Sequence, residues 1–208
     1  EHVNYDQDGS DDLVRTFLGC TADEATISSS EDDPTVTIEV SFQAAAYDNT
    51  QTPNDTSLLT QKPFQHDDLS TCEFDSSGDG GSANAIPQVE ELEMEIANNV
   101  EDLPENTNLE DAEHVPLTRE YDVTITFYPN STALHDDWKN SREGTLTIEY
   151  QRDGNPDDSV KFEFSETEIE EPGFSAPLGD VADAELSLIP RSCKVTVQND
   201  SSTYGIGN

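Results

Sequence analysis

The sequence predicts a mainly β protein, an antiparallel β-sandwich or barrel with one short flanking helix and long loop arms. Three observations predict this fold class. Apolar and polar residues alternate through most of the apolar-rich segments, which indicates strands with one buried and one wet face. Only Ser131–Asn140 has helical spacing. The stretches between these segments are rich in Gly, Pro, Asn, Asp and Ser, which favour turns and loops.

The chain has 208 residues, enough for one domain (1–208), and an extreme acidic charge. It holds 46 Asp and Glu residues against 9 Lys and Arg, a formal net charge of −37. In dilute buffer this charge opposes compaction and association. At molar salt the Debye length falls to about 3 Å and the repulsion is screened. The even spread of acids therefore predicts a protein that works in brine, because a local surface for cations or basic partners would produce acidic runs.

The first strands are expected at Leu13–Gly19, Ala22–Ser28 and Thr35–Tyr47, with a turn at Ser28–Pro34. The third is the clearest, since its apolar residues recur at every second position. They are Val36, Ile38, Val40 and Phe42. Three strands in this order predict a meander.

Asp48–Asp68 (48–68) is too long and too polar for an ordinary connection, so we expect an extended loop or arm. Its apolar side chains are Leu58, Leu59 and Phe64. A short strand should follow at Leu69–Phe74. Asp75–Ala85 (75–85) is rich in Gly and Ser, which predicts a flexible tip.

The central block alternates cleanly between apolar and polar residues. Gln88–Ile96 is expected to be a strand in spite of its glutamates, because Leu92, Met94 and Ile96 occupy alternate positions. An acidic connection, Asn98–Pro116, leads to a strand at Arg119–Tyr128. The helix at Ser131–Asn140 follows it.

Ser131 or Thr132 can cap the helix N-terminus. Leu134 and Trp138 lie four residues apart and therefore share one face, which predicts that this pair docks the helix on the sheet.

The last third predicts a hairpin and two closing strands. Gly144–Gln151 and Ser159–Glu168 should pair across the turn Asp153–Asp158. After an irregular crossing at Pro172–Gly179, strands are expected at Asp183–Ile189 and Cys193–Gln198. Residues 199–208 are expected to be a mobile tail.

The sequence contains no recognisable catalytic motif: there is no GxSxG, no P-loop and no Cys/His nucleophile arrangement. His66-Asp67-Asp68 and His135-Asp136-Asp137 repeat one triplet that contains metal-ligand residue types. Consecutive residues point in different directions, so one triplet cannot close a site, and we interpret both as solvated acids beside a histidine. No cofactor, metal site or enzymatic activity is predicted. Because no basic patch is present, classical nucleic-acid binding is disfavoured.

Cys20, Cys72 and Cys193 form no CxxC pattern, and their odd number argues against a disulfide framework. They are expected to be small buried hydrophobes, with one disulfide and one free thiol as the alternative. No apolar run approaches the roughly 18 residues of a membrane span, so no membrane association is predicted.

The order of several short segments resembles the major tail protein, or tail tube protein, of long-tailed phages and of tailed viruses of halophilic archaea. In that family a strand ends in an Asn-Asn turn, a loop follows, and the next strand begins near an arginine before one helix and further hairpins. The matching segments are Phe17–Ser28 (FLGCTADEATIS), Pro63–Asp68 (PFQHDD), Gln88–Asn99 (QVEELEMEIANN), Arg119 with Tyr121–Tyr128, the helix, and Val181–Val197. Family members carry a further segment before the Gly-Cys strand, so an upstream N-terminal segment is expected to be missing here.

The resemblance implies a mechanical function. Six subunits would form a ring, and rings would stack into the tail tube of a virion assembled in the host cytoplasm. The arm residues Leu58, Leu59 and Phe64 would contact a neighbouring subunit or ring. The lumen would hold a tape-measure protein and later pass viral DNA without sequence-specific binding, and neck and tail-tip proteins would be further partners. Together with the charge, this points to a virus of halophilic archaea.

Two other function classes fit parts of the sequence. A halophilic β-sandwich module for surface adhesion or capsid decoration shares the strands and the composition, but it would form monomers or trimers. A halophilic glycosidase would need a carboxylate pair in a cleft with a perturbed pKa. With 46 acids, such pairs arise by chance, so their presence carries little information.

Overall fold

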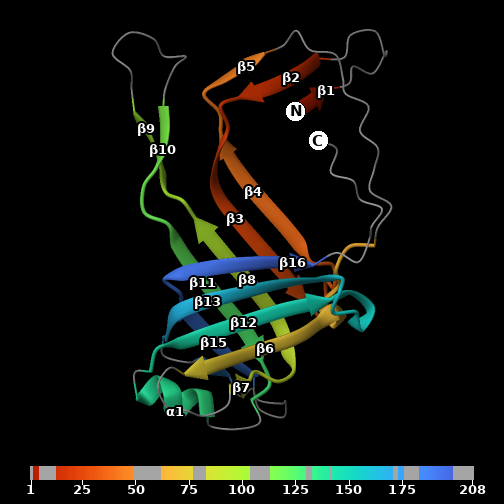
Figure 1. The fold of residues 1–208 in the computed structure, drawn as a ribbon, viewed down its shortest axis with the longest axis vertical. Helices are drawn as coiled ribbons and strands as arrows, with labels where there is room; N and C mark the ends of the chain where they lie inside the picture. The colour runs from red at the N-terminus through yellow and green to blue at the C-terminus, as the bar shows by residue number, and fades with distance from the viewer. Residues whose placement is uncertain are drawn as a thin grey trace. The chain divides into compact units, whose positions relative to one another are not determined.

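The computed structural model describes residues 2–4, 13–48, 62–76, 83–103, 113–129, 133–140, 142–170, 173–175 and 183–198, and this part of the chain is mainly strand (Figure 1). It divides into two compact units. Unit 1 comprises Glu1–Ala25, Glu39–Lys62 and Ile96–Arg119, and unit 2 comprises Thr26–Ile38, Pro63–Glu95 and Glu120–Asn208. The expected arm (49–61), most of the expected tip (77–82) and the expected tail (199–208) lie outside the described residues.

The longer strands follow the predicted segments closely in the middle and last thirds of the chain. The prediction is wrong at both ends of the expected tip, which belong to strands, and it missed the short strands in the expected connection Asn98–Pro116 and the expected crossing Pro172–Gly179. The elements in order are β1 (His2–Asn4), β2 (Leu13–Leu18), β3 (Thr21–Ser30), β4 (Thr37–Gln43), β5 (Ala46–Asp48), η1 (His66–Asp68), β6 (Leu69–Ser76), β7 (Asn84–Ala85), β8 (Val89–Ala97), β9 (Val100–Leu103), β10 (Glu113–Pro116), β11 (Glu120–Phe127), α1 (Ala133–Lys139), β12 (Gly144–Gln151), η2 (Arg152–Gly154), β13 (Ser159–Ile169), β14 (Gly173–Ser175), β15 (Asp183–Ile189) and β16 (Ser192–Gln198).

One large antiparallel sheet contains most of the strands. Its order is β4-β3-β8-β11-β15-β13-β12-β6-β7, with β14 paired to β15 and β16 paired to β13. β13 pairs with β12 and β16 along most of its length and reaches β15 only at Glu168 and Ile169. The sheet therefore changes layer at this point, which yields the predicted sandwich. In unit 2, β6, β12 and β13 lie across β11 and β15 (Figure 1).

The core of unit 2 lies between these layers. Its fully enclosed side chains are Phe74, Leu92, Met94, Val123, Ile125, Leu146, Ile148, Tyr150, Phe164, Leu186 and Leu188. They come from β6, β8, β11, β12, β13 and β15, where buried and wet positions alternate as the sequence predicts. Each large apolar side chain removed from water contributes about 1.5–3 kcal/mol, so this layer dominates the stability of unit 2.

The predicted meander of the first strands is wrong. β2 pairs with β1 and β5 in a separate three-stranded sheet, whereas β3 and β4 belong to the large sheet. Gly19 has a φ of +63° and turns the chain after β2. The predicted strand Thr35–Tyr47 is interrupted at Ala44, and the Ala45 N–H donates to the Leu18 carbonyl. The chain thus leaves β4 and joins β2, a choice that depends on distant partners rather than on alternation.

The predicted hairpin between β12 and β13 is confirmed. Leu146, Ile148 and Tyr150 face Phe164, Phe162 and Val160 in an antiparallel register. The connection is the one-turn helix η2, in which Asp153 and Gly154 both have positive φ angles. A register shift follows Gly144 at the start of β12. A Cβ atom built on Gly144 would lie 2.4 Å from the Asp75 carbonyl oxygen, so only glycine fits there.

Candidate functional site

Unit 1 contains no buried hydrophobic side chain among those that the structure describes. Five of its large apolar side chains are instead exposed, at fractions of 41–61%. They are Phe17, Leu18, Val40, Phe42 and Leu117. An apolar row that stays wet in the isolated chain marks an interaction surface when its members are contiguous.

Unit 1 contains an apolar groove, the β4 groove, which is lined by Phe17, Cys20, Phe42 and Ala44. The groove lies beside β4, which is the terminal strand of the large sheet. Glu39 is the only charged residue of β4, and the strand has no lysine or proline. Natural edge strands are commonly protected by such residues or covered by other chain, and β4 has only Glu39, with no second strand paired to it besides β3 in the described sheet.

A second exposed apolar patch lies on unit 2, where β16 forms another edge. Val195 and Val197 are 49% and 71% exposed, and they are named the β16 ridge. Their cross-strand partners are Phe162 and Val160, so the ridge shares the sheet face on which Phe162 is buried. Paired residues of an antiparallel ladder project to the same side. The core-facing side of this sheet therefore continues onto β16, where it is left uncovered.

A polar clamp, defined as Asp23, Gln43, Asn98, Asn99 and Arg119, fixes the point where the β9–β10 hairpin leaves β8. The Asn98 side chain donates to the Ala22 carbonyl (2.8 Å) and accepts from the Arg119 Nε–H (2.8 Å). Asn99 adopts a φ of +47° and donates from its side chain to the Thr118 carbonyl (2.9 Å). Asparagine tolerates this left-handed conformation better than most residues.

Asp23 completes the clamp from β3. Its carboxylate accepts from the Val100 N–H (3.0 Å) and from the Gln43 side-chain amide (3.1 Å). These hydrogen bonds lower the pKa of Asp23 below its ordinary value, and the bond from Val100 has the larger effect. The Asn-Asn turn and the arginine were evident in the sequence through the family resemblance. Asp23 was not, because its partner Val100 lies 77 residues away and no local pattern joins them.

In the first His-Asp-Asp triplet the expected surface position holds for Asp67, which is exposed, and is wrong for His66 and Asp68, which are buried. His66 is 5% exposed, its Nε2 lies 2.9 Å from the Val89 carbonyl, and its Nδ1 lies 3.0 Å from Ser29 Oγ. The Val89 carbonyl only accepts, so Nε2 carries the proton. In the neutral ring Nδ1 then accepts from Ser29, whose oxygen accepts from the Tyr150 hydroxyl at 2.9 Å. Both ring nitrogens are occupied, which leaves His66 structural.

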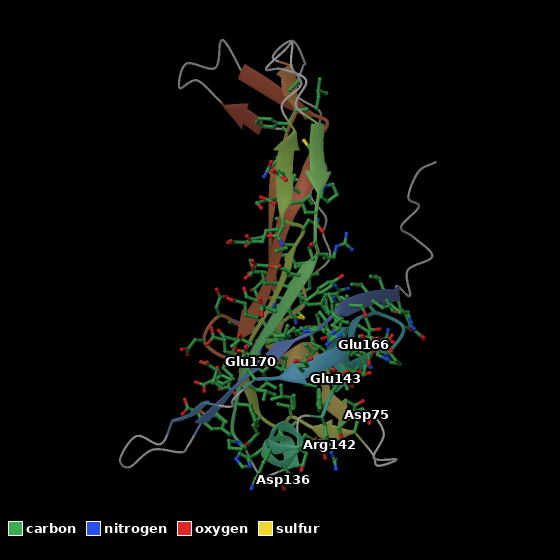
Figure 2. The ribbon with its side chains drawn as sticks, turned by 90° about the vertical axis from the view of Figure 1, so that its left-hand side faces the viewer. Asp75, Asp136, Arg142, Glu143, Glu166 and Glu170 are labelled. Carbon is green, nitrogen blue, oxygen red and sulfur yellow. The ribbon has the colours of Figure 1, made fainter. Side chains whose placement is uncertain are left out.

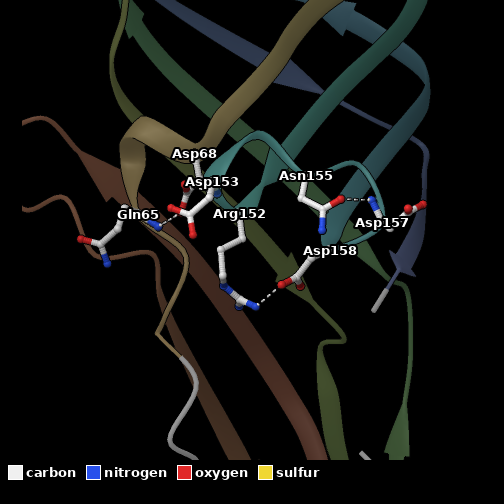
Figure 3. Close-up of polar contacts among 7 residues, drawn as sticks. All are labelled: Gln65, Asp68, Arg152, Asp153, Asn155, Asp157 and Asp158. Atoms are coloured by element: carbon white, nitrogen blue, oxygen red, sulfur yellow. Dashed lines mark hydrogen bonds and ion pairs between the residues drawn. The ribbon is translucent and has the colours of Figure 1, made fainter. Parts of the chain in front are cut away.

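Asp68 ends the same triplet and joins two connections of unit 2 (Figure 3). Its carboxylate accepts from the Gln65 N–H (2.9 Å) and from the Asp153 N–H (3.2 Å). Beside it, Arg152 donates to Asp158 (2.7 Å), which closes the turn between β12 and β13. A buried acid at a turn thus satisfies backbone N–H groups that strands leave open.

The second triplet lies on α1, and one of its acids is also buried. Asp137 is 3% exposed and accepts from Asn84 of β7 (2.9 Å) and from Arg142 (3.2 Å). Asp136, the next residue, is exposed, and so is Asp75 of β6. Figure 2 shows both acids with Arg142 at the end of unit 2 that carries α1. The expected solvated position holds for Asp136 but not for Asp137. In the described part of the chain, no three acidic, His or Cys side chains assemble a metal site.

The predicted contact residues fall partly outside the described chain. Leu58 and Leu59 lie there, and so does the side chain of Trp138. Phe64 is half-buried under the Arg152 guanidinium, which lies 4.3 Å from the ring centroid. Leu134 is 8% exposed on α1, so the helix face carrying it is covered. Docking by the Leu134–Trp138 pair stays a prediction.

The three cysteines are all free thiols. Cys72 matches the expected buried position, and burial raises the pKa of its thiol to about 12. Cys193 is half-buried and Cys20 is exposed, so the expectation fails for these two. No helix in the described part of the chain is long and apolar enough to cross a membrane.

A family model described as phage tail tube protein matches residues 2–188. Among solved structures, the tail tube of phage SPP1 superposes with a TM-score of 0.54 at 16% identity, covering 66% of this chain and 81% of that one. The sheath/tube terminator of the extracellular contractile injection system PVC gives a TM-score of 0.50 at 15% identity, covering 67% and 100%. At such identities the two structures show a shared fold. No curated protein sequence matches the chain.

Proposed function

Since the chain belongs to the phage tail tube protein family, whose members are structural virion proteins and not enzymes, we propose that copies of it form rings of six that stack into the tail tube. Viral DNA would be delivered through the lumen of this tube. The family match over residues 2–188 carries the proposal, and the fold shared with the SPP1 tail tube supports it.

The exposed surfaces of unit 1 support self-assembly on physical grounds. The described side chains of unit 1 have no core, and its apolar groups lie in water. A second copy that covers them would remove apolar area from solvent, which is the main driving force of association. The edge strand β4, a liability in an isolated chain, would then become part of an interface.

The high acidic charge supports a working environment of high salt. At a net charge of −37, identical subunits repel each other strongly in dilute buffer. Screening at molar salt removes most of that repulsion between exposed groups. We therefore propose that the protein belongs to a tailed virus of halophilic archaea and is assembled in the host cytoplasm. An acidic lumen would let DNA slide without adhering.

The expected arm, Asp48–Asp68, is the proposed clasp between subunits or rings. Leu58, Leu59 and Phe64 would provide its apolar contacts. A tape-measure protein in the lumen and neck and tail-tip proteins at the tube ends would be its further partners. The match of the tail tube family model over nearly the whole chain argues against a module for adhesion or capsid decoration.

Deleting Asn49–Lys62 tests the clasp. We expect a folded subunit that assembles poorly, because this stretch is expected to contribute contacts between copies rather than to the core of unit 2. Sedimentation velocity at high salt measures assembly, and circular dichroism checks the fold. Replacing the stretch by a Gly/Ser linker of equal length is the matched control for chain connectivity. Full assembly by the deletion variant would rule out the clasp.

A further inference from the structure

The two exposed apolar patches raise the question of what covers each of them. A ring of identical subunits requires a heterologous contact, in which one surface of a subunit meets a different surface of the next. A patch that pairs with itself would stop at a dimer. A subunit that forms a ring through apolar contacts therefore needs two distinct apolar patches. The described chain offers two, and they lie on different units.

We propose that the β4 groove of one copy packs against the β16 ridge of the next, and this inference rests on the proposed function. The groove is lined by Phe17, Cys20, Phe42 and Ala44, so it accepts apolar side chains. The ridge presents Val195 and Val197 from a sheet edge, and both are branched aliphatic side chains that fit such a groove. The occupant is a second copy of this chain.

The sheet geometry supports the ridge as an unfinished interior. Val195 shares its face with Phe162, which is 5% exposed, yet Val195 itself is 49% exposed. The apolar face of β13 thus extends one strand beyond its cover. Association that completes this layer would bury side chains on a surface already shaped as a protein interior.

The charge distribution favours the same pairing. β16 contributes Lys194, which lies with Lys161 around Glu163 on the other face of the strand. Arg191 precedes the strand and bonds to Glu168. Residues 191–198 hold two of the chain's 9 basic residues and no acid. β4 has a single charge, that of Glu39. These two strands are therefore among the places where two such acidic molecules can approach with least repulsion.

Cys20 provides a test in the unaltered protein, because it lines the β4 groove and is exposed. Iodoacetamide labelling followed by mass spectrometry compares the assembled sample at high salt with subunits dispersed in lower salt, each against a free thiol in the same buffer. We expect labelling of Cys20 to fall at least tenfold on assembly. Cys72 is the internal control, since it is buried in either state. Equal labelling of Cys20 in assembled and dispersed samples would overturn the inference.

Cross-linking tests the pairing itself. In a Cys20→Ser and Cys193→Ser background, Phe42→Cys and Val197→Cys are combined and treated with a short bis-maleimide. Both positions are exposed, so the substitutions spare the core. We expect a ladder of covalent oligomers from the double variant and monomers from each single variant. Phe42→Cys with Ser70→Cys is the matched negative control, because Ser70 is exposed on β6 away from the ridge.

The outcomes separate this inference from the proposed function. Dimers from either single variant would show a self-pairing contact and contradict the heterologous one. Large assemblies by sedimentation without a ladder and without protection of Cys20 would refute this contact while leaving the tube intact. Failure of the unaltered protein to assemble at any salt would refute the proposed function and this contact together.

Discussion

At the scale of single residues, hydrogen-bond satisfaction decides where polar side chains are tolerated. Ser29 is 4% exposed and links His66 to Tyr150 inside unit 2. In this series of hydrogen bonds each donor is matched to one acceptor, and the last acceptor is the Val89 carbonyl. Burial raises the pKa of Tyr150 to about 12, and the bond to Ser29 opposes that shift. The phenol therefore stays protonated and remains a donor under ordinary conditions.

Replacing Ser29 by alanine should expose the cost of this network. The change leaves the Tyr150 hydroxyl and His66 Nδ1 without their partner, and a buried unsatisfied group costs about 1–3 kcal/mol. Denaturant unfolding at high salt measures the loss. Ser70→Ala is the matched control, because the Ser70 hydroxyl bonds to the Glu149 carbonyl at an exposed position. Equal losses for the two variants would show that the buried network contributes nothing beyond an ordinary surface hydrogen bond.

At the scale of elements, the clamp determines how the β9–β10 hairpin is held. β9 and β10 pair only with each other in the described chain, and an isolated two-stranded hairpin is marginal in water. The clamp compensates by bonding the start of β9 to β3 and by bonding the end that follows β10 to Asn98 and Asn99. Asn98 is its central member, because it bonds to Ala22 and Arg119 at once.

Asn98→Ala should loosen the hairpin and leave the core intact. We expect faster amide hydrogen exchange in Val100–Leu103 and unchanged exchange in β12 and β13, since local opening follows the loss of local hydrogen bonds. Mass spectrometry of proteolytic fragments measures both regions. Asn155→Ala, which removes an exposed turn contact to Asp157, is the control and should leave Val100–Leu103 unchanged. Uniform acceleration across the molecule would mean that the clamp supports global stability instead.

Gly144 tests the packing of β12 against β6. A Cβ at this position would meet the Asp75 carbonyl and the Phe74 ring, at 2.4 and 2.5 Å. Gly144→Ala should therefore destabilise the protein by about 1–3 kcal/mol, the usual range for overpacking. Thermal or denaturant unfolding measures the change. In Gly173→Ala the new Cβ lies 3.7 Å from Glu185, an ordinary contact, so this control should change little. A neutral Gly144→Ala would show that β12 shifts freely.

The elements also show what sequence reasoning can reach. Strands β8, β11, β12, β13, β15 and β16 and the helix were predicted because alternation or helical spacing is local. The break in Thr35–Tyr47 was not, since it depends on the pairing of Ala45 with Leu18. The buried positions of His66, Asp68 and Asp137 were missed for the same reason. Their partners include Ser29, Asp153 and Asn84, which lie 37, 85 and 53 residues away.

At the scale of the whole molecule, charge and apolar exposure act against each other. The net charge of −37 opposes contact between copies, while burial of the exposed apolar side chains of the β4 groove and the β16 ridge would favour it. Salt shifts the balance, because screening weakens repulsion between exposed charges more than it affects apolar burial. Kosmotropic salts additionally strengthen apolar burial.

Electron microscopy of the purified protein at about 2–4 M salt, where screening is nearly complete, tests the central claim most directly. We expect six-fold rings or hollow tubes, which disperse as the salt is lowered. Circular dichroism of the same sample establishes that the protein is folded. Dispersed, folded, full-length monomers at every salt concentration would contradict self-assembly into a tail tube.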